Sequence, residues 1–120
     1  MKTNSSAAQL RIFISSTDKF KDSSLSESIV FQAKKQGLAG ATVIKGMMGY
    51  GASSIIHSYK FWEVSEKVPT IIEIVDDEVK IRAFYETIRP ILEEMKNGCL
   101  VTLQAVDVLL YKPGKKKLFD

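Results

Sequence analysis

Two stretches of the chain show the apolar period of a helix, and each lies between stretches with strand-like patterns. Residues 25–36 follow an alternating stretch at 9–16 and precede an apolar stretch at 41–48. The second helical stripe follows a β-branched run at 70–75 and precedes a final strand-like stretch at 100–111. A helix between two strands makes those strands run parallel through a right-handed crossover. This βαββαβ order therefore predicts an α+β fold, the ferredoxin-like plait, with an antiparallel sheet and two helices on one face.

The first half of this pattern has clear boundaries. Alternate apolar residues from Leu10 to Ile14 share one face of the first strand. The first helix begins at a capping box, in which the Ser24 hydroxyl and the Glu27 carboxylate can each satisfy a free backbone N–H. Gly37 stands where a left-handed residue would end that helix.

The second half of the pattern carries a proline in its helix. The β-branched run at 70–75 predicts a central strand that is buried on both faces. The Asp pair at 76–77 suits the N-cap and first turn of the helix that follows. Pro90 lies inside the helical stripe, and its missing N–H predicts a kink or a restart near Arg89. The Asn-Gly pair at 97–98 would close this helix.

Residues 9–112 are predicted to form the domain, between a flexible N-terminal tail at 1–8 and a basic C-terminal tail at 113–120. A weaker strand-like stretch lies at 58–64. The two helices would cover one face of the sheet and leave the other bare. Several strands carry Ile, Val and Leu on both sides, so the bare face is too apolar for water and predicts a subunit interface.

The composition excludes several kinds of site. The 120 residues include 17 Lys and Arg against 14 Asp and Glu, a net charge of 17 − 14 = +3, which favours an anionic ligand without indicating nucleic acid. One cysteine, Cys99, and one histidine, His57, exclude an intrachain disulfide, a cysteine-based zinc site and any two-histidine site. No apolar run reaches the roughly 20 residues that span a bilayer, and residues 1–8 lack the apolar core of a signal peptide. We expect a cytoplasmic protein without membrane insertion.

Glycines concentrate in one segment, GLAGATVIKGMMGYG at residues 37–51, which holds five of the seven. Gly46 and Gly51 have the spacing of a phosphate loop, but Ala52 stands where that loop requires a lysine. A dinucleotide motif fails because Ser54 replaces its last glycine. Converging backbone N–H groups could bind a phosphate here. The alternative is that these glycines shape turns, bulges and a helix end.

Two basic side chains, Lys45 and His57, flank the glycine segment and could neutralise a phosphate or a carboxylate. The alternative is that they are a solvated lysine and a structural histidine. A catalytic pair of His57 with Cys99 lacks an orienting group at any supporting spacing. Helix capping explains the acidic run at 76–78 more simply than a metal site does. No catalytic residue and no metal ligand is predicted.

Three segments carry a family resemblance: LRIFIS at 10–15, GLAGATVIKGMMGYGASSIIHS at 37–58 and VPTIIEIVDDEVKI at 68–81. Together they resemble the PII-like domain of unknown function 190 family, which is related to the nitrogen-regulatory PII signalling proteins and, more distantly, to the CutA-type trimers. The likeness spans residues 10–111. It implies a PII-like homotrimer of ferredoxin-like subunits that acts in signalling, is not an enzyme and requires no cofactor.

In PII proteins an adenine nucleotide sits between adjacent subunits, and the resemblance transfers its contacts to this chain. The threonine that meets the adenine corresponds to Thr42, and the strand positions whose main chain lines the base correspond to Glu73 and Val75. The Gly-aromatic-Gly at the base of the signalling loop, whose backbone N–H groups face phosphate, is the GYG at 49–51. The predicted ligand-binding residues are Thr42, Lys45, Gly49, Tyr50, Gly51, His57, Glu73, Val75 and Gly98.

The loop before the last strand departs from the PII pattern. PII proteins have a Gly/Arg/Lys-rich phosphate loop there, and this chain has KNGC at 96–99. Each charge-assisted contact contributes about 1.5–3 kcal/mol, so losing two or three of them would weaken triphosphate binding by several decades. The expected effector is therefore AMP or another adenine nucleotide, with AMP preferred to ATP. The loop at 52–67 would be presented to a regulated protein partner, and its Tyr59 does not match the tyrosine that PII proteins modify.

Two further functions occur on the same element order. A single-stranded RNA-binding module, the alternative, needs aromatic side chains on a central strand to stack bases, and residues 70–75 contain none, so nucleic acid is not the expected partner. An acylphosphatase-type enzyme needs an arginine in an anion-binding loop after the first strand. The sequence SSTD at 15–18 offers hydroxyls and a carboxylate there instead.

Overall fold

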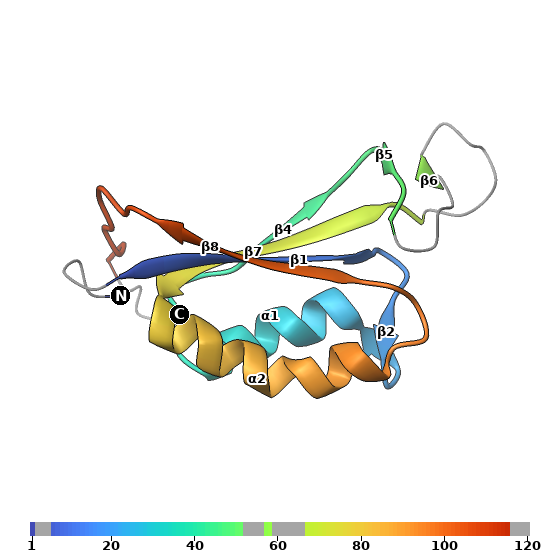
Figure 1. Cartoon of the computed structure of the whole chain (residues 1–120), viewed down its shortest axis with the longest axis horizontal. Coiled ribbons are helices and arrows are strands. Elements are labelled where there is room, and N and C mark those ends of the chain that lie inside the picture. The colour runs from blue at the N-terminus through green and yellow to red at the C-terminus, as the bar shows by residue number, and fades with distance from the viewer. Residues whose placement is uncertain (2–5, 52–56, 59–66, 116–120) are drawn as a thin grey trace.

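A computed structural model of the chain describes residue 1 and residues 6–51, 57–58 and 67–115. Its centre is a four-stranded antiparallel sheet with both helices against the same face (Figure 1). The predicted ferredoxin-like plait is confirmed. In spatial order the strands are β4 (Thr42–Lys45), β7 (Pro69–Asp77), β1 (Ala7–Ser15) and β8 (Leu100–Val106), and the helices are α1 (Leu25–Lys35) and α2 (Glu78–Glu94).

The core lies between the sheet and the helices. Along β1 and β7 every second side chain is buried, as a strand with one covered face requires. Each helix adds a stripe of residues three or four positions apart. Full burial of a large apolar side chain contributes about 1.5–3 kcal/mol. The fully buried large residues are Ile12, Leu25, Ile29, Val68, Ile72, Ile74, Ile81, Phe84 and Ile88.

Helix α1 begins and ends close to where the sequence predicts. The backbone N–H of Glu27 donates to the Ser24 hydroxyl at 3.4 Å, which is the Ser24 half of the predicted capping box. Gln36 is the C-cap, and Gly37 follows with φ of 79°, a left-handed conformation that glycine adopts without strain.

Helix α2 corrects two expectations. The helix runs through Pro90 without interruption, so the predicted restart near Arg89 is wrong. Pro90 and Glu86 are both exposed, so water can satisfy the Glu86 carbonyl that proline leaves without a donor. The Asp pair was expected to supply the N-cap and the first turn of α2. Instead, Asp77 is the N-cap, without a side-chain cap bond, and Asp76 is the last buried residue of β7.

The Asn-Gly pair at 97–98 lies beyond the helix, which ends at Glu94 with Met95 as its C-cap.

Strand lengths follow from the available partners. Strand β8 ends at Val106, which pairs with Ala7 at the start of β1, so the predicted extension to residue 111 has no neighbour to pair with. Strand β1 starts two residues before the predicted strand, and Ala7 and Ala8 are buried rather than part of a flexible tail. The predicted single strand at 41–48 is two pieces, β4 and β5 (Met48–Gly49).

Three short strands complete the fold. β2 (Lys19–Phe20) pairs with β3 (Ser23–Ser24) in a short hairpin. β6 (His57–Ser58) pairs with β5 in an arm beyond the end of the sheet (Figure 1). The weaker strand expected at 58–64 lies, after Ser58, outside the described residues. Within the described part of the chain, no helix is long and apolar enough to cross a membrane.

Candidate functional site

The sheet face opposite the helices is built of cross-strand rows. Residues that pair across antiparallel strands share a face, so the register aligns side chains from all four strands. One such row is apolar and consists of Ile44, Ile71, Phe13 and Leu100. Ile44 is 41% exposed and Leu100 57% exposed. The strand β7 is therefore central but buried on one face only within a single chain, whereas burial on both faces was expected.

The next row is polar and holds two of the predicted ligand residues. It consists of Thr42, Glu73, Arg11 and Thr102, in the order of the strands. The Nε of Arg11 donates to Oε2 of Glu73 at 2.8 Å, and both side chains are partly open to solvent. Val75 is two positions further along β7, so it lies on the same face and pairs with Gln9. The structure thus brings Thr42, Glu73 and Val75 together at the β4 side of the open face.

Lys45 lies on the other side of the sheet. It pairs with Thr70, whose side chain faces the core, so Lys45 projects from the helix side of β4 and not beside Thr42. It is exposed, and the described residues give it no ion pair. Side chains alternate between the two faces of a strand, so Thr42 and Lys45, which are three positions apart on β4, lie on opposite faces.

The arm formed by β5 and β6 is fixed to the sheet through Pro69. The backbone N–H of Gly46 donates to the Pro69 carbonyl at 2.7 Å. A Cβ on Gly46 would come within 3.3 Å of Pro69, and a Cβ on Gly49 within 3.1 Å of its ring. These two glycines therefore let the arm lie directly against the proline.

The glycine and aromatic residues of the predicted phosphate cradle lie along this arm. Gly49 pairs with His57 across β5 and β6, so the two predicted ligand residues are neighbours along the backbone pairing. Tyr50 is 72% exposed. Gly51 is also exposed, and a Cβ there would meet nothing within 4 Å. No contact within the described chain accounts for a glycine at position 51.

Gly98, like Lys45, is a predicted ligand residue that the fold separates from Thr42, in this case by placing it at the other edge of the sheet. It lies two residues before Leu100 on β8, and two strands stand between β8 and β4. Leu100 pairs with Phe13 near the end of β1 where Ser15 meets Pro69, so Gly98 lies at the same end of the sheet as the arm. Within one chain, the two halves of the predicted site are on opposite edges.

The loop before β8 is held by a buried carboxylate. The Nδ2 of Asn97 donates to Oδ1 of Asp18 at 2.8 Å, and the backbone N–H of Ser15 donates to its Oδ2 at 2.8 Å. Burial raises the pKa of the neighbouring Cys99 thiol, and the negative charge of Asp18 raises it further. Asn97 is therefore engaged within the chain, and Lys96 is the cationic side chain of the KNGC loop.

A second buried carboxylate holds the loop that leads into β4. Asp76 is fully buried, and its Oδ2 accepts from the backbone N–H of Ala39 at 2.8 Å while its Oδ1 accepts from that of Asp77 at 2.6 Å. The Nζ of Lys80 lies 3.9 Å from Oδ2 and donates to the Gly37 carbonyl at 2.8 Å. This carboxylate fixes the chain three residues before Thr42 and was not predicted as more than a helix cap.

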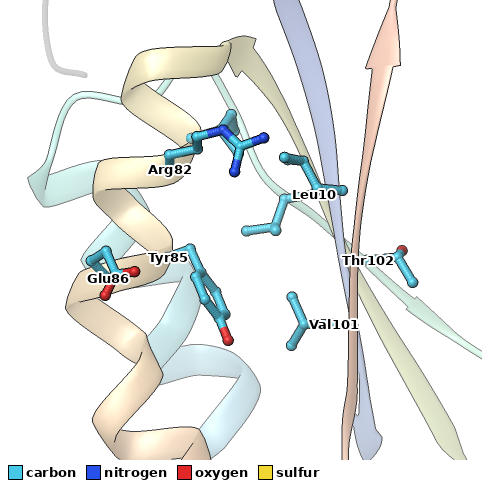
Figure 2. A pocket seen from close by; sticks show the side chains of 8 residues that line it. Leu10, Arg82, Tyr85, Glu86, Val101 and Thr102 are labelled. Atoms are coloured by element: carbon cyan, nitrogen blue, oxygen red, sulfur yellow. The ribbon is translucent and has the colours of Figure 1, made fainter.

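A groove of about 340 Å³ lies between α2 and the edge strand β8. Figure 2 shows the α2 side chains Arg82 and Tyr85 extending toward Leu10 and Val101 of the sheet, while Glu86 lies on the side of the helix farther from the strands. None of the predicted ligand residues lines it. The sequence signal that could have indicated it is the Arg-x-x-Tyr-Glu spacing beside the buried stripe of α2. Among the described residues, no group of three or more His, Cys, Asp and Glu side chains could hold a metal ion.

The fold is that of PII-like proteins. The chain is similar to the structure of CPII, a nitrogen regulatory PII-like protein from Thiomonas intermedia K12 bound to ADP, AMP and bicarbonate, with a TM-score of 0.59 and 16% identity over 86% of this chain and 90% of that one. At that identity the likeness is one of fold.

The model of the DUF190 family, described as an uncharacterized ACR, matches residues 7–108, and the chain belongs to this family. It is 35% identical over 100 residues to a UPF0166 protein of Aquifex aeolicus (strain VF5), covering 83% of this chain and 90% of the relative. It is 32% identical over 103 residues to UPF0166 protein MJ1524 of Methanocaldococcus jannaschii, covering 86% of this chain and 90% of that relative. The resemblance seen in the sequence is confirmed.

Proposed function

We propose that the protein is a cytoplasmic PII-like regulator, not an enzyme, that binds an adenine nucleotide between the subunits of a homotrimer. AMP is preferred to ATP. The observation that carries the proposal is the division of the ligand residues between two opposite open edges of one sheet. Thr42 and the arm lie at the β4 edge, and Gly98 lies at the β8 edge. A second copy is needed to complete the site.

The two edges are suited to meet. Three successive antiparallel pairings make β4 and β8 antiparallel to each other. The β4 edge of one copy can therefore continue the sheet of the next, and repetition of that contact by rotation closes a ring in which no edge is left open. The helix-side residues of that β4, Val43 and Lys45, then face the groove between α2 and β8. The apolar row through Ile71 and Phe13 turns toward the ring centre, which removes it from water.

The charge available around the phosphate supports a monophosphate. The loop before β8 offers one cationic side chain, Lys96, and the amide of Asn97 is already engaged with Asp18. The arm offers backbone N–H groups around Gly49 and Gly51, which is the geometry that accommodates an anion without a side-chain charge. A site with few cations can balance the charge of AMP, whereas the greater negative charge of ATP with its magnesium needs more of them.

The arm supports a regulatory role. Its exposed apolar residues, Met47, Met48 and Tyr50, are 71%, 62% and 72% exposed, which is unusual for a surface that meets only water. The sequence at 52–67 continues from it. We propose that nucleotide binding at the base of the arm sets the conformation that a protein partner recognises.

Titration of AMP, ADP and ATP during thermal unfolding of the full chain tests the nucleotide assignment. A ligand at 100 times its Kd should stabilise the protein by about 2.7 kcal/mol, and AMP should do so at the lowest concentration. Sedimentation equilibrium should give three times the monomer mass. A stable monomer, or no shift with any adenine nucleotide, refutes the proposal.

Two glycine variants sharpen the test. A Cβ at Gly51 or at Gly40 meets nothing within 4 Å, so Gly51→Val and Gly40→Val should both fold and assemble. Only Gly51→Val should lose the AMP shift, because its side chain blocks the backbone approach of the phosphate. Retained AMP binding in Gly51→Val contradicts the backbone cradle.

A short single-stranded RNA serves as the comparison ligand for the alternative function. Phe13 lies on the open face of a central strand, the kind of position where an RNA-binding module places a stacking aromatic, and it is flanked by Ile71 and Leu100 rather than by a second aromatic. We therefore expect RNA to leave the unfolding transition unchanged. A shift with RNA and none with nucleotide would favour the RNA-binding module.

A further inference from the structure

The chain leaves the sheet at Val106 and continues with side chains that do not join the core. Residues 107–115 form neither strand nor helix. Leu109 is 95% exposed and Leu110 is 79% exposed, and Leu109 is the most exposed large apolar residue among those described. Two adjacent leucines held in water are unfavourable unless another apolar phase receives them.

The sequence around these leucines has a consistent chemistry. Residues 109–119, LLYKPGKKKLF, which we call the leucine–lysine tail, contain four lysines and no acidic residue. An apolar pair stands at each end, and Pro113-Gly114 in the middle opposes a continuous helix. The tail thus combines a local charge of +4 with two apolar ends, whereas the whole chain has a net charge of +3.

The described part of the tail, residues 109–115, lies at the opposite end of the sheet from the arm. In Figure 1 the red segment after β8 is beside the N-terminus, and β5 and β6 are at the other end of the molecule. A surface bound by the tail would therefore leave the arm accessible.

We propose that the leucine–lysine tail binds the protein reversibly to an anionic lipid bilayer. The lysines are attracted to the acidic headgroups, and Leu109 and Leu110 enter the boundary between headgroups and acyl chains. This is interfacial binding and not a membrane span. Nucleic acid fits less well, because its phosphates explain the lysines but leave the leucines in water. The proposal is independent of nucleotide binding.

Sedimentation of the full-length protein with lipid vesicles tests the proposal. The protein should bind vesicles that contain phosphatidylglycerol and should not bind vesicles of phosphatidylcholine alone. Binding should weaken as salt rises from about 0.1 M to about 1 M, because the screening length falls from about 10 Å to about 3 Å. Equal binding to both vesicles, or none to the anionic ones, overturns the proposal.

Charge variants separate the tail from the general charge of the protein. Lys112→Gln with Lys115→Gln should weaken binding about 30-fold, since each lysine near an acidic surface contributes roughly a factor of five. The matched control is Lys19→Gln with Lys21→Gln, two exposed lysines at the β2–β3 hairpin, which should bind like the unmodified protein. Equal loss in both pairs means that the attraction is not specific to the tail and overturns the assignment.

Apolar variants test the insertion. Leu109→Ser with Leu110→Ser should weaken binding roughly 10-fold or more. Phe31→Ser removes an apolar side chain that is 68% exposed on α1, and it should leave vesicle binding unchanged. If the leucine variant instead binds vesicles normally but changes the sedimentation mass, the leucines serve contact between copies and the proposal fails. Tail-dependent binding to RNA without binding to vesicles also overturns it.

Discussion

Replacement of Asp76 tests whether a buried carboxylate sets the position of the loop that leads into β4. Asp76 is fully buried and accepts two backbone hydrogen bonds, from Ala39 at 2.8 Å and from Asp77 at 2.6 Å. A hydrogen bond to a charged group contributes about 1.5–3 kcal/mol. Asp76→Ala removes both acceptors and should cost about 3–6 kcal/mol, which is a large part of the roughly 5–15 kcal/mol that stabilises a domain.

The isosteric change Asp76→Asn gives the sharper measurement, because it leaves no cavity. An asparagine retains one acceptor oxygen and turns its amide donors toward the other backbone N–H, so we expect a loss of about 2–3 kcal/mol. Urea unfolding followed by circular dichroism measures this loss. Asp107→Asn, at an exposed acidic residue after β8, is the control and should stay within about 0.5 kcal/mol of the parent. If Asp76→Asn is as stable as the control, the carboxylate does not hold the loop.

Three further variants or reactions probe other parts of the fold. Thr70 carries a buried hydroxyl that has no hydrogen-bond partner among the described residues, so Thr70→Val should raise the free energy of unfolding by about 1–2 kcal/mol, and a loss in urea unfolding would contradict this. Pro90→Ala should stabilise α2 by about 1–3 kcal/mol, because alanine restores the N–H donor to the Glu86 carbonyl; an unchanged melting temperature speaks against it. Burial and Asp18 raise the pKa of Cys99, so its reaction with iodoacetamide should begin at higher pH in the folded protein than in the urea-unfolded chain, and coincident pH profiles would refute that account.

Much of the fold could be predicted because periodicity reports burial directly. The alternation through Leu10 and Ile14 and the stripe through Phe84 gave the strands and helices, and their order left few topologies. Strand ends were harder, because they depend on partners distant in the sequence. Nothing near Tyr111 shows that β1 begins opposite Val106.

The candidate site was predictable only as a set of residues and not as an arrangement. Lys45 and Thr42 are three positions apart in the sequence, but side chains alternate along a strand, so the two lie on opposite faces of the sheet. Gly98 required the strand order before its separation from the arm became visible. Gly49 and Pro69 are twenty positions apart, so neither segment alone predicts that they contact each other.

The ion pair of Arg11 with Glu73 has a consequence for symmetry. Cyclic assembly multiplies every side chain near the axis, so an isolated glutamate on this face would be repeated and would repel its own images. Because the Arg11 guanidinium lies 2.8 Å from the Glu73 carboxylate within the same chain, the two charges offset each other before any copies meet. In the proposed ring, this face can therefore approach the same face of a second copy without a countercharge from it.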